Sequence, residues 1–249
     1  MKITEWSSSK FLQSVQLECW DDVSNQTVET TLKWLEDEQL MHRLQQSLRY
    51  ATPLHGEILD LGAGSLWLTA YLSKLDSIKR VCAVELAKNR IEQIGIPLFN
   101  HLKGNADKTE VFVGDAHQLK FADKTFDFIL CDGFLHHLDN LKFGLKEIHR
   151  VLRKGGYLIA IREPATAYYR NPEKVIPQKH IDVEYQRYTK QYMYEIAERG
   201  FHLRKILRFP RSEYRNIKVN KQLLACFPLN LALGTILHCD ISIIAQKPA

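Results

Sequence analysis

Residues 58–69 read ILDLGAGSLWLT, and this stretch decides the fold class. The apolar residues from Ile58 to Leu61 predict the end of a buried strand, and a glycine-rich turn follows it. Such a turn between a strand and a helix commonly binds a nucleotide-like ligand. A dinucleotide loop, however, requires a third glycine where Trp67 stands. The stretch therefore indicates a ligand loop, but one that is not built for a dinucleotide.

The residues on both sides of this loop alternate between apolar strands and helical segments. Five strands are expected over 57–61, 80–85, 110–114, 126–132 and 157–162. The clearest helix begins after Asn140, which can cap it, and closes at Gly155. A further helix is expected from Thr189 to Gly200, followed by strands over 202–209 and 238–248 with a helix around 221–236 between them. This order predicts an α/β fold with a doubly wound, mostly parallel sheet.

Residues 1–50 lack a convincing strand, and their leucines recur at helical spacing from Val28 to Leu48. We therefore expect an N-terminal helical cap over 1–50 and a second domain over 51–249, with an insertion at about 211–236. The loop from Ala165 to Arg187 has no clear period and is rich in tyrosine, which is typical of a loop over a binding site.

Composition narrows the class of protein further. The chain has 249 residues, a net charge of +5 and five widely spaced cysteines. That cysteine pattern indicates neither a disulfide framework nor a metal site. The first ten residues lack the apolar core of a signal peptide, and Pro228 and Asp240 interrupt the most apolar stretch. We expect a cytoplasmic protein without a membrane span.

Acidic residues stand at the carboxyl ends of the expected strands, where open parallel sheets bind ligands. Asp60 ends the first strand, Glu85 the second, and Asp115 follows the third. Glu85 is suited to the two hydroxyls of a ribose, and Asp115 to an adenine amino group. The fourth strand leads into CDGFLHHL and the fifth into IREP. Joint occurrence in this order favours a nucleoside-containing ligand. Carboxylates near the loop favour a cationic ligand over a pyrophosphate.

Four segments together resemble class I S-adenosylmethionine-dependent methyltransferases, in the branch that methylates small molecules. They are ILDLGAGS (58–65), VCAVEL (81–86), VFVGDAHQLKFADKTFDFILCDGFLHHL (111–138) and EIHRVLRKGGYLIAIREP (147–164). The resemblance implies S-adenosylmethionine as cofactor and S-adenosylhomocysteine as product. It also implies a seven-stranded sheet whose last strand is antiparallel and inserted between the fifth and the sixth. Leu66 departs from the pattern, because glycine is frequent at that position.

The same resemblance implies which residues bind the cofactor. The methionine end would contact Asp60 and the glycine loop, and the ribose hydroxyls would contact Glu85. Leu86 would lie against the adenine, whose edge Asp115 and Ala116 would read. Cys131 and Asp132 would lie beside the methionine moiety and the sulfonium. The implied set is Asp60, Gly62, Ala63, Gly64, Glu85, Leu86, Asp115, Ala116, Cys131 and Asp132.

Candidates for catalysis and acceptor binding follow the fourth and fifth strands. A hydroxyl acceptor must lose its proton, and histidine is suited to accept it near neutral pH. His137 is the preferred base and His136 the second choice, since a catalytic histidine occupies the position of His137 in phosphoethanolamine methyltransferases, which resemble this stretch. Glu163 can bind a cationic or hydroxylated acceptor. Candidate acceptor contacts are Tyr168, Tyr188 and Trp20.

A basic segment leaves two alternatives open. Arg199, Arg204, Lys205, Arg208 and further cations up to residue 221 accompany a single acid. The leading hypothesis is methyl transfer to a small molecule, and an anionic acceptor would explain the segment. One alternative is methylation of RNA or a nucleotide, although the sequence contains no recognised RNA-binding module and we expect no nucleic-acid partner. The other is a protein that binds the cofactor without catalysis.

Overall fold

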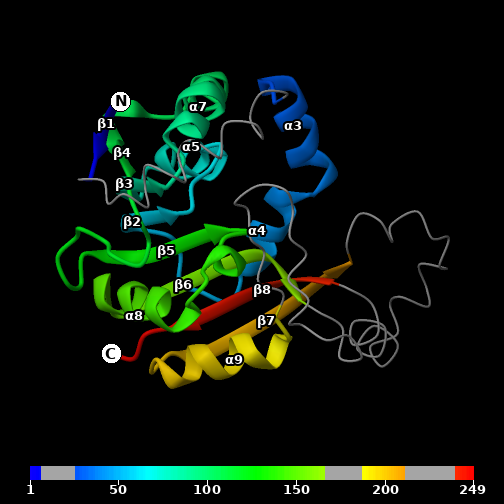
Figure 1. The fold of residues 1–249 in the computed structure, drawn as a ribbon, viewed down its shortest axis with the longest axis vertical. Helices are drawn as coiled ribbons and strands as arrows, with labels where there is room; N and C mark the ends of the chain where they lie inside the picture. Colours follow the sequence, from blue (N-terminus) through cyan, green and yellow to red (C-terminus); the bar gives the residue numbers. More distant parts are fainter. Residues whose placement is uncertain (7–25, 166–186, 211–238) are drawn as a thin grey trace, which may run out of the picture.

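Figure 1 shows the computed structural model, which describes residues 1–6, 26–165, 187–210 and 239–249. The strands are β1 (Lys2–Glu5), β2 (Gly56–Leu61), β3 (Ile78–Glu85), β4 (Thr109–Val113), β5 (Phe126–Asp132), β6 (Leu152–Ala165), β7 (His202–Pro210) and β8 (Cys239–Gln246). The helices are α3 (Val28–Asp37), α4 (Leu40–Leu48), α5 (Trp67–Ser73), α6 (Lys88–Arg90), η1 (Ile91–Gly95), α7 (Ile96–His101), η2 (Ala106–Lys108), η3 (Leu135–His137), α8 (Leu141–Val151) and α9 (Thr189–Glu198).

The strands form one sheet in the order β1-β4-β3-β2-β5-β6-β8-β7. Neighbouring strands from β1 to β6 are parallel, whereas β8 is antiparallel to both β6 and β7. The strand order reverses at β2. On one side of β2 the sheet continues through β3 and β4, and on the other side it continues through β5. The prediction of a doubly wound sheet with its last strand antiparallel and inserted is confirmed.

Two details of the predicted fold are wrong. The described sheet has eight strands and not seven, because Lys2–Glu5 pairs in parallel with β4 in the part that we expected to lack strands. Trp6, which follows this strand, packs its ring directly on Gly114 after β4, where an added Cβ would lie only 1.9 Å from the ring. A four-residue edge strand is too short to show a period-two pattern. The second error concerns α8, which ends at Val151 rather than at Gly155.

Helices cover both faces of the sheet (Figure 1). On one face, α8 and α9 pack on the strands through a cluster that includes Leu145, Ile148 and Ile196. On the other face, α4 and α5 bury Leu44, Leu68 and other apolar residues against the central strands. Because successive strand residues point to opposite faces, Leu59 and Leu61 of β2 belong to the first cluster and Ile58 to the second. Asp60 therefore points toward the α5 side.

The N-terminal helices α3 and α4 are tied to the sheet by a buried charge. Thr27 caps α3 in a capping box with Thr30. Arg43 of α4 is only 2% exposed, and its Nη1 donates to Asp240 Oδ2 of β8 at 2.9 Å. Its Nε donates to the carbonyl of Glu38 at 2.9 Å. The division at residue 50 stays a prediction, as does an insertion at 211–236, which lies outside the described residues.

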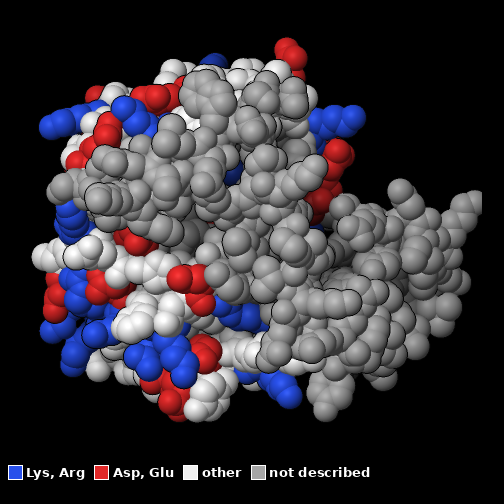
Figure 2. Space-filling view, in the orientation of Figure 1, with Lys and Arg blue, Asp and Glu red and all other residues white. Residues whose placement is uncertain are grey.

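Basic and acidic side chains are interspersed on the described part of the face in Figure 2. On β7, Arg204 bonds the side chain of Gln246 and Lys205 lies 5.2 Å from the ring centre of Tyr50. The rest of the basic segment, from residue 211 on, lies outside the described residues. Within the described ranges, no helix combines the length and the apolar character that a membrane crossing requires.

Candidate cofactor site

The glycine turn after β2 lies at the centre of the carboxyl edge of the sheet. Gly62 has φ +72° and Gly64 φ +48°, values in the left-handed region that L-residues rarely adopt. A Cβ on Gly62 would lie 2.1 Å from the ring of Phe134, which follows β5. A Cβ on Gly64 would be in ordinary van der Waals contact, 3.7 Å from Arg90 Nε, and Gly64 itself is partly exposed. Ala63, between them, is buried.

The side chain of Leu66 packs in the core beneath the turn. Its side chain is fully buried, and it packs toward Gly95 in a cluster with Ala70 and Phe99. Its φ is +57°, so this leucine has a backbone conformation that favours glycine. The leucine keeps the conformation because burial of its side chain offsets part of the strain.

Asp60 is buried beneath the turn. It is 1% exposed, and its Oδ2 accepts a hydrogen bond of 2.5 Å from Thr69 Oγ1 on α5. Burial raises the pKa of Asp60 to about 7, against the smaller lowering effect of the Thr69 hydroxyl, and the nearby Asp132 raises it further. A carboxyl with this pKa is easily ionised when a positive charge comes near.

Glu85, at the end of β3, holds two loops together. Its Oε2 accepts from the backbone N–H of Gly64 at 2.8 Å. Its Oε1 accepts from the N–H groups of Leu86 and Ala87 at 2.8 and 3.0 Å. The carboxylate and the glycine turn are therefore adjacent, as the sequence predicts for a residue that binds a ribose diol. Leu86 is partly exposed beside them.

Asp115, after β4, is paired with a histidine that the sequence alone does not single out. Its Oδ1 accepts from the backbone N–H of His117 at 2.8 Å and lies 2.9 Å from His117 Nδ1. The hydrogen bond from His117 lowers the pKa of Asp115, and the same contact raises the pKa of His117. His117 Nε2 also lies 3.1 Å from Asp139 Oδ1, in the loop after β5. Ala116 is buried behind this pair.

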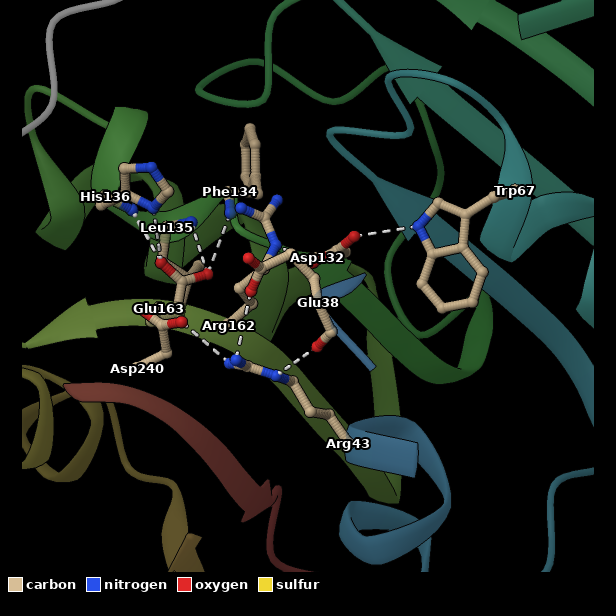
Figure 3. A network of polar contacts seen from close by, with 10 residues as sticks. All are labelled: Glu38, Arg43, Trp67, Asp132, Phe134, Leu135, His136, Arg162, Glu163 and Asp240. Atoms are coloured by element: carbon tan, nitrogen blue, oxygen red, sulfur yellow. Dashed lines mark hydrogen bonds and ion pairs between the residues drawn. The ribbon is translucent and has the colours of Figure 1, made fainter. Parts of the chain in front are cut away.

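Asp132 ends β5 between two donors from different elements (Figure 3). Trp67 Nε1 of α5 donates to Oδ2 at 2.9 Å, and Arg162 Nε of β6 donates to Oδ1 at 2.8 Å. The register that pairs Asp60 with Leu130 places Asp132 level with the glycine turn. The residue before it, Cys131, is fully buried in the core, and burial raises the pKa of its thiol well above the usual value.

Glu163 is fully buried and organises the loop after β5. Its Oε1 accepts from the N–H groups of Phe134 and Leu135 at 3.0 and 2.9 Å. Its Oε2 accepts from the N–H of His136 at 3.1 Å and lies 3.0 Å from His136 Nδ1 (Figure 3). Burial would raise the pKa of this carboxyl, but the His136 contacts and the backbone donors outweigh it, so that the pKa is lowered. Glu163 thus fixes the position of the loop from Phe134 to His136.

The two histidines after β5 have different environments. The His136 side chain is 5% exposed and is fixed by Glu163, whereas His137 is exposed. Their rings are 4.0 Å apart between centroids. Arg187 binds the same loop, since its Nη2 donates to the carbonyl of Leu138 at 2.7 Å. Glu163 and Arg187 therefore hold the loop on two sides, and His137 projects from it.

The remaining predicted contacts are more distant or not described. Tyr188 precedes α9 and is partly exposed, while Tyr168 and Trp20 lie outside the described residues. A groove of about 670 Å³ opens between the starts of α8 and α9. Lys142, Lys190 and Glu195 line it, but none of the four carboxylates of the sheet edge does. Asp139, which also lines the groove, connects it through His117 to Asp115.

The described residues fit a cationic nucleoside cofactor. Asp60, Glu85, Asp115 and Asp132 lie at or just after the carboxyl ends of the four adjacent strands β2, β3, β4 and β5, with Asp60 buried beneath the turn. Gly64 in the turn is partly exposed, and Arg90 Nε, 3.7 Å from where a Cβ on Gly64 would lie, is buried without a hydrogen-bond partner in the described part of the chain. The fold defines a Rossmann-like α/β domain.

Comparison with known proteins finds similarity to methyltransferases. A model of the methyltransferase domain matches residues 59–160. A sarcosine/dimethylglycine N-methyltransferase of Aphanothece halophytica is 30% identical over 42% of this chain and 36% of that protein. A ubiquinone/menaquinone biosynthesis C-methyltransferase of Hydrogenovibrio crunogenus is 30% identical over 49% of this chain and 48% of that protein. The chain therefore matches between a third and a half of the length of these curated relatives.

A solved structure shares the fold. It is a phosphoethanolamine N-methyltransferase 2 of Haemonchus contortus in complex with S-adenosyl-L-methionine, with a TM-score of 0.60 and 17% identity over 84% of this chain and 52% of that chain. Residues 59–160 are therefore similar to the methyltransferase domain, and the described fold is that of a Rossmann-like methyltransferase.

Sequence reasoning misses three side chains at this site. Trp67 stands out in the sequence only as the residue in place of a glycine, although its indole donates to Asp132. Arg162 lies in the segment IREP, and its charge at a strand end is the available signal. His117 follows Asp115 by two residues, a spacing from which a side chain readily bonds a neighbouring carboxylate.

Proposed function

We propose that the protein transfers a methyl group from S-adenosylmethionine to a small-molecule acceptor. The observation that carries the proposal is the glycine turn after β2, with acidic residues of four adjacent strands at its sides and beneath it. Relatives named for sarcosine/dimethylglycine and for quinone precursors act on small molecules by their names, which supports the same class here. Within this class we propose an anionic acceptor.

Within this proposal each carboxylate has a role. Glu85 binds the ribose hydroxyls, and Asp115 accepts from the adenine amino group beside Ala116 and Leu86. Asp60 and Asp132 supply negative charge at the methionine end, with Cys131 contributing a backbone carbonyl. When bound, the cofactor supplies a methyl group that its sulfonium activates, so the protein chiefly orients the acceptor and excludes water.

His137 is the proposed general base for a hydroxyl acceptor. It is exposed on a loop that Glu163 fixes from beneath, while His136 is buried and bonded to the same carboxylate. A base must reach the acceptor, and the exposed ring satisfies this condition better than the buried one. Glu163 and His136 are then positioning residues, because their polar atoms are engaged with each other and with the loop.

The test is incubation of a small-molecule extract with the protein and S-adenosylmethionine labelled in its methyl group. We expect labelled small products, absent with Glu85→Ala and strongly reduced with His137→Ala. The Glu110→Gln variant, a surface carboxylate on β4, is the matched control. Label that appears only in RNA would contradict the proposed acceptor class, and binding without any labelled product would refute catalysis. Undiminished turnover of His137→Ala on a hydroxyl acceptor would remove His137 as the base.

A further inference from the structure

The cation Arg162 stands at an edge that is otherwise built for a cationic ligand. It is adjacent to Asp132, and its charge would oppose the binding of a sulfonium unless the ligand also carried a negative group. The methionine end of S-adenosylmethionine is a zwitterion with one amino group and one carboxylate. Asp132 complements the amino group, which leaves the carboxylate without a proposed partner.

The backbone directs Arg162 to this place. The register between β6 and β8 shifts between Ala160 and Glu163, so that one extra residue enters β6 there. Arg162 itself has φ +58°, which is unfavourable for a residue with a side chain. Bulges of this kind re-aim side chains beside functional sites. The result is a guanidinium that turns from the strand end toward Asp132 and away from the register of its neighbours (Figure 3).

Contacts on three sides fix the guanidinium. Its Nε donates to Asp132, and its carbon lies 4.9 Å from the ring centre of Trp34 on α3. On the side of Gly133 the guanidinium packs closely on the backbone, since an added Cβ would lie 2.2 Å from Arg162 Nη2. The terminal nitrogens Nη1 and Nη2 have no hydrogen-bond partner among the residues described. A fixed guanidinium with two uncommitted nitrogens is suited to a carboxylate.

Trp67 completes the arrangement from the other side. Its indole N–H holds the second oxygen of Asp132, so that the acid is fixed between the glycine-loop helix and the bulge of β6. We infer that Asp132 and Arg162, held by Trp67, Trp34 and the bulge, form a receptor for the zwitterionic amino-acid end of the cofactor. Asp132 faces the amino group and Arg162 binds the carboxylate. This inference rests on the proposed cofactor site.

The experiment compares three ligands by isothermal titration calorimetry on the full chain. S-adenosylhomocysteine carries both groups, its decarboxylated analogue keeps only the amino group, and methylthioadenosine carries neither. We expect Arg162→Gln to weaken S-adenosylhomocysteine by about tenfold or more, the loss typical of a hydrogen bond to a charged group. The same variant should change the affinity for the two other ligands by less than about twofold on the same reasoning. Arg80→Gln, which breaks ion pairs elsewhere on the sheet, is the control.

A second pair of variants separates the roles of the two charges. Asp132→Asn should weaken both ligands that carry the amino group and spare methylthioadenosine. Arg162→Lys keeps the charge but loses the fork, so the preference for S-adenosylhomocysteine over its decarboxylated analogue should fall between wild type and Arg162→Gln. If Arg162→Gln does not fold, Arg162→Lys and Trp34→Leu replace it. Both variants should lower the ratio of the affinity for S-adenosylhomocysteine to the affinity for its decarboxylated analogue.

An equal loss of affinity for all three ligands would assign Arg162 a structural role only and would overturn the inference. No loss of affinity with Arg162→Gln, or with the variants that replace it, would overturn it as well. Wild-type protein that fails to bind S-adenosylhomocysteine would refute the cofactor site itself and the inference with it. A selective loss for S-adenosylhomocysteine together with no methylated acceptor would refute the proposed transfer and leave the receptor for the amino-acid end intact.

Discussion

Replacement of Asp60 by asparagine tests the buried carboxyl beneath the glycine turn. Asparagine has the same shape, and its oxygen can still accept the hydrogen bond from Thr69. Unlike aspartate it stays neutral at every pH, although its NH2 group replaces the O–H of the protonated carboxyl. At pH 5 the wild-type carboxyl is mostly protonated, since burial raises its pKa to about 7, so that the two proteins should have similar stabilities.

The expected effect follows from linkage. The ordinary pKa of an aspartate, which applies to the unfolded chain, is 3.8, and the pKa of Asp60 in the folded protein is about 7, so the folded state binds more protons over this range. The free energy of unfolding therefore falls as the pH rises through it. At about 1.36 kcal/mol for each pKa unit, the wild type loses about 4 kcal/mol in total. Between pH 5 and pH 8 the difference is about 2 to 3 kcal/mol, and the asparagine variant should not show it.

The assay is chemical denaturation of both proteins at pH 5, 6, 7 and 8 (values chosen to span the raised pKa of about 7). The wild type should become less stable relative to Asp60→Asn as the pH rises. Parallel stability curves would refute the reasoning, because they would mean that the carboxyl is solvated or already ionised. A cationic ligand beside Asp60 should also release a proton from it near neutral pH, which calorimetry in buffers of different ionisation enthalpy detects.

Three further perturbations test the contacts around the site. Glu163→Gln should lower the free energy of unfolding by about 2 kcal/mol or more at pH 7, because it leaves buried donors unpaired. Urea denaturation measures this loss, with Glu110→Gln as the control. The difference from wild type should vanish as the pH falls through the lowered pKa of Glu163, since the stabilisation needs the ionised carboxylate. Leu66→Gly should be more stable than Leu66→Ala by about 1 kcal/mol in thermal melts, as both lose the core contact but only glycine relieves the strain at φ +57°; the opposite order would contradict that strain. Arg43→Met should lower the free energy of unfolding by about 3 to 5 kcal/mol in urea denaturation, because it removes one partner of the buried ion pair between Arg43 and Asp240, and the double variant with Asp240→Leu should recover part of this loss.

Most of the sheet could be predicted from the sequence because its central strands are buried on both faces. Continuous apolar runs such as Phe126–Asp132 carry a strong signal, and the predicted bounds of this strand agree with the structure. The edge strand β1 has no such signal, since its residues are half solvated and its partner β4 is distant in sequence. The predicted end of α8 is wrong because Leu152 continues the helical spacing, whereas β-sheet pairing with Phe126 fixes it in a strand.

The site could be predicted only in part, for a related reason. A carboxylate at a strand end is visible in the sequence, but its partner comes from another strand or helix. Thus the sequence identifies Asp132 but not its donors Trp67 and Arg162, which are 65 and 30 residues away. The position of Arg162 depends on a bulge, and a bulge is a property of the pairing of β6 with β8 rather than of either strand alone.

The contacts of the glycine turn also connect the two ends of the site. Gly64 donates to Glu85, at the end proposed for the ribose, and Trp67 donates to Asp132, at the end proposed for the methionine moiety. Because the two donors are so close in the chain, a shift of the turn at one end moves the other. The fully buried Leu66 lies between them and fixes the turn to the core. A ligand that binds both ends therefore meets groups that the fold already holds in place, which lowers the cost of ordering the site.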